Sequence, residues 1–369
     1  MLDSLTISNY RCFRKFRVNK LARVNLLLGK NNSGKTAILE AIMLLVTRGD
    51  PGILFQISQR RQDELVHLPA IPGIPLIDFG QFVYWHRIAT GDSGFSISPQ
   101  SGNPGVEFKV EPLGTQPQRD TPPTDLRLPA PDALLRIGPV LDGNLTDETF
   151  VWPLSRSGTL LFPPSRFPEH PQTRWGAAQH VMYLGPGLPT SQELGSLWSF
   201  LQKTRGLEQQ VYKIIRLMVP QIEDIVFPPA GSEAVFRGAI LVGAEGEQNR
   251  IPLGNFGDGV RHLLQLAIAV FSVAQGGILL LDEIENGLHY SLMPQLWNAI
   301  IEAANQRDIQ IFAATHSNDC INSLASIISE SSGLASQVAA HQIDCHLTDA
   351  ISFSGDEIRI AAEHEIEVR

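Results

Sequence analysis

The stretch "LLLGKNNSGKTAILEAI", from Leu26 to Ile42, matches the pattern G-x-x-x-x-G-K-[ST] between an apolar run and a helical one. Glycines at these positions let backbone N–H groups close around phosphate oxygens without a Cβ in the way. The lysine places a positive charge on the terminal phosphates of a nucleotide, the threonine offers a hydroxyl to Mg²⁺, and the following helix directs its N-terminus at the same anion. The predicted phosphate loop consists of Gly29, Lys30, Asn31, Asn32, Ser33, Gly34, Lys35 and Thr36.

Two later segments are expected to complete a nucleotide site. "GILLLDE" is an apolar strand pattern ending at Asp282, whose carboxylate can hold Mg²⁺ together with Thr36. The next residue, Glu283, can orient or deprotonate an attacking water. "FAATHS" places His316 just beyond another buried strand, and open α/β sheets bind ligands at such strand ends, so His316 is expected to face the γ-phosphate. The simpler alternatives are a strand end that meets solvent and a structural histidine.

A second glycine-rich turn precedes a long helical pattern. In "NFGDGVRHLL", Gly257, Asp258 and Gly259 stand directly before the helix, and a helix N-terminus of this kind suits phosphate. Because the chain already has a phosphate loop at residues 29–36, the second turn is predicted to bind the nucleotide of another subunit. The alternative is an ordinary glycine/aspartate helix cap.

The composition is that of a globular chain. Its 369 residues are 43% hydrophobic and 18% charged, which favours one large core or two smaller domains over a disordered or coiled-coil protein. The apolar runs are too short to span a bilayer, the N-terminus has no apolar signal core, and the three cysteines suggest no disulfide framework. These features predict a cytoplasmic protein with no membrane association.

The charge is distributed unevenly. The net charge of −9 argues against a protein that coats nucleic acid over its whole surface. Residues 1–35 contain eight Lys/Arg and one acid, whereas residues 282–369 contain fourteen acids and three arginines. A basic N-terminal region on an acidic body suits a local site for phosphates. For the arginines outside the loop, an ordinary solvated face is the alternative.

The sequence pattern divides the chain into three parts. Residues 1–50 predict strands, the phosphate loop and a helix that stops at "RGDPG". Residues 51–180, with fourteen of the 25 prolines between Pro99 and Pro171, contain the β-like runs "QFVYWHRIA", "GVEFKVEPL" and "TLLFPP" and predict an inserted β-rich lobe with loops. Residues 181–369 predict a helical subdomain, a hairpin around "AEGE" and then helices alternating with buried strands. That alternation is typical of a parallel sheet covered on both faces.

Together these segments resemble the ABC-type ATPase heads of the RecF/SMC class, which have a P-loop NTPase fold with a mixed or parallel sheet and an N-terminal β lobe. Their closest resemblance is to stand-alone ATPases of the OLD (overcoming-lysogenization-defect) family. "LTISNYRCFRKF" is similar to the opening strand pair of that class, "GKNNSGKT" to its Walker A loop and "FGDGVRHLL" to its variant signature. "LLLDEIENGLH" is similar to its Walker B strand and D-loop, "AATHS" to its switch-histidine segment and "AAEHEIEVR" to the ending of stand-alone members. The resemblance leaves residues 51–180 uncovered in detail.

The resemblance implies an ATPase that uses ATP and Mg²⁺. Within it, Lys35 and Thr36 bind phosphate and metal, and Asp282 supports the metal. Glu283 is then the catalytic carboxylate and His316 the switch histidine.

The same resemblance implies a homodimer or higher oligomer that sandwiches ATP. The signature residues Gly257, Asp258 and Gly259 would act in trans, Asn286–His289 would form the D-loop, and Arg11 would contact the nucleotide. Three departures from the family pattern stand out. Gly257 replaces a serine that donates to the γ-phosphate. Asp258 would repel phosphate if it pointed inward, so that Arg261 is expected to compensate. No clear Q-loop glutamine is present, and Gln192 is a candidate.

OLD nucleases carry a Toprim nuclease domain after the ATPase, whereas 53 residues follow His316 here. We therefore expect an ATPase subunit that serves a separately encoded effector, such as a Toprim-type nuclease in phage defence. The alternatives are a RecF-like DNA repair or maintenance ATPase that binds DNA and, less expected, the nucleotide-binding subunit of an ABC transporter. "HQIDCH", from His341 to His346, suggests zinc but has no second ligand pair at the expected spacing.

Overall fold

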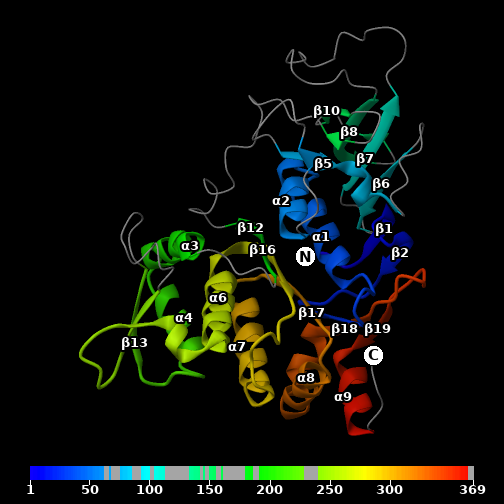
Figure 1. Cartoon of the computed structure of the whole chain (residues 1–369). Helices are drawn as coiled ribbons and strands as arrows, with labels where there is room; N and C mark the ends of the chain where they lie inside the picture. The colour runs from blue at the N-terminus through cyan, green and yellow to red at the C-terminus, as the bar shows by residue number, and fades with distance from the viewer. Residues whose placement is uncertain are drawn as a thin grey trace.

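The computed structural model describes residues 1–61, 66–67, 75–84, 93–99, 104–112, 133–141, 144–145, 149–154, 159–160, 179–185, 191–227 and 240–364. These residues form a central sheet with helices on both faces and a second, antiparallel sheet (Figure 1). The last five residues of the family-like ending "AAEHEIEVR" lie outside the described residues.

The central sheet has six strands in the order β12-β16-β17-β3-β18-β19. The first five strands run parallel, and β19 pairs antiparallel with β18 at the edge. Parallel neighbours need long crossover connections, which helices supply here. The strands are β3 (Val24–Leu28), β12 (Gln179–Leu184), β16 (Val273–Asp282), β17 (Gln310–Thr315), β18 (Val338–Gln342) and β19 (Ile351–Ser354).

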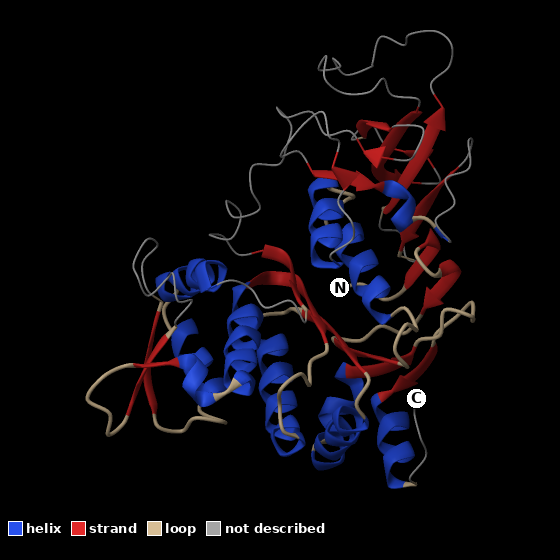
Figure 2. Ribbon diagram, viewed as in Figure 1, coloured by secondary structure: helices blue, strands red, loops and turns tan. Residues whose placement is uncertain are grey.

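Alternate residues of these strands face opposite sides of the sheet. Leu280 and Phe312 belong to one hydrophobic cluster together with α1 (Lys35–Val46), whereas Leu279 and Ile311 belong to the other. Because both faces are covered, no polar alternation is needed, and all six residues of β17 are buried. The predicted parallel α/β sheet is therefore confirmed, with helices above and below the strands in Figure 2.

Helix α1 covers one face of the central sheet, and a layer of longer helices covers the other (Figure 1). Pro294 lies in the first turn of α7, as predicted, where its missing N–H breaks no helical hydrogen bond. The helices of this layer and of the C-terminus are α6 (Asp258–Ser272), α7 (Met293–Gln306), α8 (Asn318–Glu330) and α9 (Gly355–Glu363).

Two helices and three short strands lie beside α6, in the part of the chain for which a helical subdomain is predicted. Helices α3 (Ser191–Lys203) and α4 (Leu207–Ile215) contribute to the same hydrophobic cluster as α6. The strands β13 (Ile222–Val226), β14 (Leu241–Ala244) and β15 (Ile251–Pro252) form an antiparallel sheet. The pairing of β14 with β15 confirms the hairpin predicted around "AEGE".

The second sheet contains strands from both the N-terminal segment and the predicted insert. Its order is β2-β1-β6-β7-β8-β10-β11-β5-β4, with β9 paired to β8. Strand β6 pairs directly with β1, so the expected boundary near residue 50 divides the sequence but not this sheet. The strands are β1 (Leu5–Tyr10), β2 (Phe13–Val18), β4 (Val66–His67), β5 (Pro75–Asp78), β6 (Ser93–Ser98), β7 (Gly105–Pro112), β8 (Ala133–Leu141), β9 (Asn144–Leu145), β10 (Phe150–Leu154) and β11 (Thr159–Leu160).

The insert differs from its prediction at two places. It opens with a helix, α2 (Pro51–Arg61), because Pro51 suits a first helical position and the Asp50 carboxylate accepts the Gly52 N–H at 2.8 Å. "RGDPG" therefore ends one helix and begins the next. The run "QFVYWHRIA" was predicted as a strand, but its first two residues end the 3-10 helix Phe79–Phe82. Residues 85–89 of this run lie outside the described residues.

The run "GVEFKVEPL" is confirmed as β7, whereas only the first two residues of "TLLFPP" are described, as β11. No helix in the described part of the chain is both long enough and apolar enough to cross a bilayer. The cytoplasmic location expected from the sequence stays a prediction.

His341 is a fully buried polar residue near the carboxyl end of β18. Its Nδ1 lies 2.9 Å from Ser352 Oγ, and its Nε2 lies 3.2 Å from Asn25 Oδ1. Burial disfavours the charged imidazolium and lowers the pKa of His341 to about 4.

This histidine predicts a pH-dependent stability. An unfolded histidine has a pKa of about 6.5, so only the unfolded chain protonates His341 between about pH 6.5 and 4. The free energy of unfolding should therefore fall by about 3 kcal/mol over that interval through this residue. Denaturant titrations from pH 7 to pH 4 should show a shallower fall for His341→Gln. The His364→Gln variant, exposed after α9, should keep the wild-type slope, and an unchanged slope in His341→Gln would contradict the prediction.

Candidate active site

A cleft of about 970 Å³ lies at the carboxyl ends of β3, β16 and β17. This edge is where open α/β sheets bind ligands. Its lining comes from the turn after β1, the phosphate loop, the ends of β16 and β17, and the loop after β18. Of the predicted site residues, it brings together Arg11, Asn31, Asn32, Ser33, Gly34, Lys35, Thr36, Asp282, Glu283 and His316.

The phosphate loop is a tight turn that only glycine fits at two positions. Gly29 and Gly34 have φ angles of 148° and 104°. A Cβ on Gly34 would lie 2.3 Å from Phe13 Cζ, and one on Gly29 would lie 2.6 Å from the Ile343 carbonyl oxygen. The loop is therefore packed between the β1–β2 hairpin and the residue that follows β18. Gly29, at the start of the loop, is not among the described residues that line the cleft.

Lys35 holds the loop from inside. Its Nζ donates to the carbonyl oxygens of Gly29 at 2.6 Å and Lys30 at 2.9 Å. Burial lowers the pKa of Lys35, whereas the carboxylates of Asp282 and Glu285 act in the opposite direction. The ammonium group is thus held within the loop that would surround terminal phosphates.

Thr36 and Asp282 meet across the cleft. Thr36 Oγ1 donates to Asp282 Oδ2 at 2.8 Å, and Tyr183 Oη at the end of β12 donates to the same oxygen at 3.0 Å. Burial raises the pKa of Asp282, and both hydrogen bonds oppose that shift. A hydroxyl and a carboxylate are hard oxygen donors that suit Mg²⁺, so these two residues would hold it. Bound there, Mg²⁺ would neutralise charge that develops on the phosphates.

Glu283 lines the same cleft as Asp282, although successive strand residues normally face opposite sides. The backbone explains this: Glu283 has a φ of 55°, in the left-handed region that side chains other than glycine rarely adopt. The chain leaves β16 at this residue and turns its carboxylate toward the cleft. Strained backbone of this kind is often found at functional positions.

His316 is held by an acid that sequence reasoning did not single out. Glu285 Oε1 accepts the His316 backbone N–H at 3.1 Å and lies 3.2 Å from its Nδ1. The Glu285 side chain is 14% exposed and that of His316 is 54% exposed. The carboxylate therefore orients an imidazole that can still reach a ligand in the cleft.

Arg11 lines the cleft but is engaged with the protein. Its Nη1 donates to the Gln81 carbonyl at 3.0 Å, its Nε lies 3.5 Å from Glu40 Oε2, and its guanidinium lies 4.5 Å from the centre of the Phe82 ring. The buried Glu40 carboxylate also accepts from Arg61 Nε at 2.5 Å. Contact between Arg11 and a nucleotide stays a prediction.

The signature turn Gly257–Gly259 is not among the described residues that line the cleft. It packs instead on the D-loop, because a Cβ on Gly259 would lie 2.4 Å from the Gly287 carbonyl oxygen. Gly257 and Asp258 are exposed, and Arg261 is half-buried one turn further along α6. Gln192 belongs to the first turn of α3, and its side chain lies outside the described part of the structure.

Three functional side chains were missed by sequence reasoning, and each left a faint signal. Glu40 is the single acidic residue in the apolar helical run "TAILEAIMLLV". Tyr183 carries the single side-chain hydroxyl in the apolar strand run "VMYL". Glu285 lies within "LLLDEIENGLH" but follows two acids that the pattern explains more directly. An isolated polar group in an apolar element indicates a buried partner, but not which one.

Two family models match the chain. Residues 164–321 match the model described as "AAA domain, putative AbiEii toxin, Type IV TA system". Residues 1–67 match the model described as "AAA ATPase domain". Together, the two matched regions contain the phosphate loop and the signature turn. They also contain the cleft residues Asp282, Glu283 and His316.

Individual proteins are similar to the chain at low identity. The "ATP/GTP phosphatase" of Helicobacter pylori is 20% identical over 348 residues, covering 89% of this chain and 89% of its own length. An Smc head domain from Pyrococcus furiosus, bound to the C-terminal domain of ScpA, has a TM-score of 0.48 at 9% identity and 99% coverage of each chain. The recombination mediator protein RecF has a TM-score of 0.43 at 12% identity, covering 96% of this chain and 98% of its own.

The fold and the cleft, with the matches to ATPase domains, define a P-loop ATPase. The chain is an enzyme that hydrolyses ATP. Membership of the OLD family stays a prediction.

Lys35→Ala is expected to abolish nucleotide binding. The substitution removes the charge beside the terminal phosphates and both hydrogen bonds inside the loop, so affinity should fall by about 100-fold or more. Titration with a fluorescent ATP analogue measures this. Lys213→Ala, an exposed lysine on α4, is the matched control, and wild-type affinity in Lys35→Ala would refute the assignment.

Glu283→Gln is expected to bind ATP and hardly hydrolyse it, because a neutral amide cannot accept a proton from water. The turnover rate should fall by about 10²- to 10⁴-fold, while the affinity for ATP stays within a few-fold of wild type. Phosphate release and equilibrium binding measure the two quantities. Glu302→Gln, an exposed acid on α7, controls for the loss of charge, and wild-type turnover in Glu283→Gln would show that another group is the base.

Proposed function

We propose that this ATPase is a switch in which two copies close around ATP. Each nucleotide would lie between the phosphate loop of one copy and the signature turn of the other. One observation carries the proposal: the described cleft contains the phosphate loop, the carboxylates and His316, but not the turn Gly257–Gly259.

The exposed signature turn has the properties of a phosphate-binding surface. It begins α6, a helix of 15 residues, and no side chain caps its first N–H groups. Such unpaired N–H groups and the helix dipole attract anions. Gly257 leaves room for a close approach, since a Cβ built on it meets nothing within 4 Å. Beside it, Asn286 and Gly287 of the D-loop are also exposed, so the two segments offer one surface to a second copy.

Within the closed pair, hydrolysis would rest on groups already gathered in the cleft. Lys35 would neutralise charge on the β- and γ-phosphates, and Glu283 would take a proton from the attacking water. His316, oriented by Glu285, would contact the γ-phosphate. Loss of that phosphate would remove the group that joins the two copies.

A mixing experiment tests the arrangement in trans. Lys35→Ala removes the phosphate loop's charge, and Asp258→Trp places a bulky side chain on the exposed signature turn. Each variant alone should have almost no ATPase activity. Mixed in equal amounts, they can form one intact site from the loop of the Asp258→Trp copy and the signature of the Lys35→Ala copy. We therefore expect ATPase activity to reappear on mixing.

The control is a mixture of Lys35→Ala with Glu283→Gln. These two changes fall on the same side of the interface, so every composite site in the mixture is damaged or lacks its base, and activity should stay low. If Lys35→Ala and Asp258→Trp fail to complement each other while each still binds its partner in gel filtration, the site is not shared between copies.

We further propose that the switch controls a separately encoded effector, such as a Toprim-type nuclease, in phage defence. Two observations support this. The family model matched by residues 164–321 carries a toxin–antitoxin description, and toxin–antitoxin systems have more than one component. The motifs of the chain also resemble those of OLD-family ATPases, which act with Toprim nucleases.

Co-purification with the product of the neighbouring gene tests the effector. The Glu283→Gln variant with ATP should hold the closed state, and the nucleotide-free protein the open one. The effector is expected to bind one of these states more tightly than the other. Absence of association in every nucleotide state would contradict the effector proposal and leave the ATP-dependent pairing intact.

A RecF-like role on DNA is the second candidate function. Arg14 and Lys15 are exposed on β2, the edge strand of the antiparallel sheet, and exposed basic side chains suit the phosphate backbone of DNA. In that case DNA should raise the turnover rate, binding should weaken steeply with salt, and Arg14→Glu together with Lys15→Glu should remove both effects. Equal turnover with and without DNA would favour the effector.

A further inference from the structure

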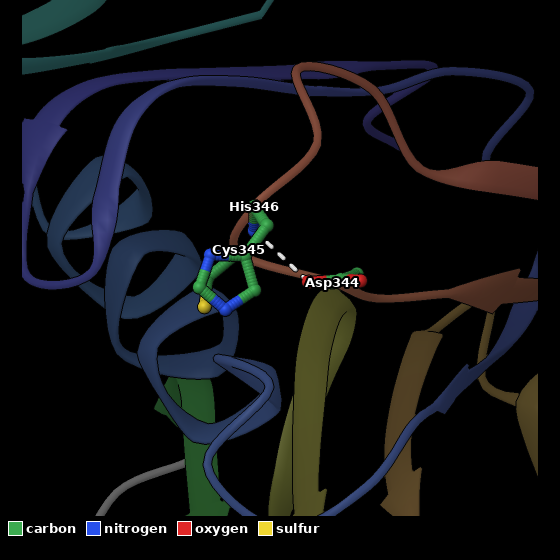
Figure 3. A group of neighbouring side chains, drawn as sticks. All are labelled: Asp344, Cys345 and His346. Carbon is green, nitrogen blue, oxygen red and sulfur yellow. Dashed lines mark hydrogen bonds between the residues drawn. The ribbon is translucent and has the colours of Figure 1, made fainter.

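A cluster of thiol, imidazole and carboxylate groups lies at the rim of the nucleotide cleft. Asp344, Cys345 and His346 follow β18 in one short loop, and Figure 3 shows their side chains together. One donor atom from each lies within 4.8 Å of the others. Asp344 Oδ1 accepts the His346 backbone N–H at 2.9 Å, which leaves the second carboxylate oxygen for another partner.

A fourth donor comes from a distant part of the chain. Cys12, in the turn between β1 and β2, lines the cleft together with Cys345 and His346. Both thiols lie against the phosphate loop, Cys12 beside Gly34 and Cys345 beside Asn32. The sequence run "HQIDCH" lacks a second ligand pair, but the fold brings Cys12 to it from more than three hundred residues away.

We propose that Cys12, Cys345, His346 and Asp344 bind a divalent ion of the zinc type. Two thiolates, an imidazole and a carboxylate are the donors that Zn²⁺ takes in tetrahedral sites. Such a site places its donors about 3.3–3.8 Å apart. The three loop donors must therefore close by about an ångström, and Cys12, which is not part of their 4.8 Å group, must move toward them. His346 is exposed and Asp344 and Cys345 are half-buried, so their side chains are free to make that adjustment.

This site is chemically different from the one formed by Thr36 and Asp282. Mg²⁺ prefers oxygen donors, whereas thiolates select zinc-like ions. Both thiols also contact the phosphate loop. Cys345 Sγ lies 4.0 Å from the Asn32 carbonyl oxygen, and Cys12 Sγ lies 3.0 Å from where a Cβ on Gly34 would be. An ion held here would therefore stabilise the loop from the rim of the cleft without occupying the Mg²⁺ position.

Metal binding by the nucleotide-free protein tests the site. Under a phosphine reductant, Co²⁺ should bind with one ion per chain and give a thiolate-to-metal absorption band. Cys12→Ser and Cys345→Ser should each reduce that band by about half, since each removes one of two thiolates. Zn²⁺ should displace Co²⁺ and abolish the band, whereas a large excess of Mg²⁺ should not.

Three variants keep the test decisive. Cys320→Ser removes the remaining, buried cysteine on α8 and should leave the band unchanged. His346→Ala changes an exposed side chain, so it should fold normally yet bind Co²⁺ at least tenfold more weakly. Zn²⁺ should raise the thermal midpoint of the wild type and not that of Cys345→Ser.

A band unaffected by Cys12→Ser or Cys345→Ser, or one lost in Cys320→Ser, would overturn the proposal. So would the absence of stoichiometric binding. None of these measurements uses ATP, so their failure would not bear on the proposed ATP-dependent switch.

Discussion

The hydrogen bond from Thr36 Oγ1 to Asp282 Oδ2 joins residues 246 positions apart, and the rest of the site depends on the geometry behind it. It can form because β3 and β16 belong to one parallel sheet, with β17 between them, so that all three strands end at the same edge. The helix that starts at Lys35 then returns across one face of the sheet. The alternating apolar residues of the strands, packed on both faces, hold this arrangement in place.

A buried acid links the cleft to the antiparallel sheet. Glu40, 4% exposed on α1, accepts from Tyr10 at 3.2 Å and from Arg61 at 2.5 Å and lies near Arg11. An unpaired carboxylate in such a place would be strongly destabilising, so its three partners from β1, the turn after β1 and α2 must stay close. Next to it, the guanidinium of Arg60 stacks 4.4 Å from the Tyr183 ring. Helix α2 is thereby connected to the tyrosine that supports Asp282.

Three of the seven described non-glycine residues with left-handed φ angles, Arg11, Asn32 and Glu283, line the cleft. Asn32 and Glu283 both have left-handed φ angles, 63° and 55°, and both line the cleft. Each position costs of order 1–3 kcal/mol, which the surrounding packing must offset. This backbone conformation holds the phosphate loop and the Glu283 carboxylate in place before a ligand binds. A site that is pre-organised in this way loses little free energy to rearrangement when it binds phosphate.

The sequence by itself determined the elements and much of the chemistry. Local patterns were enough for the glycine loop with its helix, the strands that end at Asp282 and before His316, the α/β class and the hairpin around "AEGE". These features depend on backbone conformation and on the period of apolar residues, which neighbouring positions in the chain set. The helix at Pro51 was missed because the same dipeptide signals suit both a helix stop and a helix start.

Only the tertiary structure decided which side chains meet. Tyr183 contacts Asp282 and Glu285 contacts His316, and Cys12 and Cys345 line one cleft, although these residues are far apart in sequence. The exclusion of the signature turn from the described cleft is likewise a matter of sheet order and helix packing. Contacts of this kind depend on the distance between side chains in the folded protein. The spacing of apolar residues along the chain does not determine that distance.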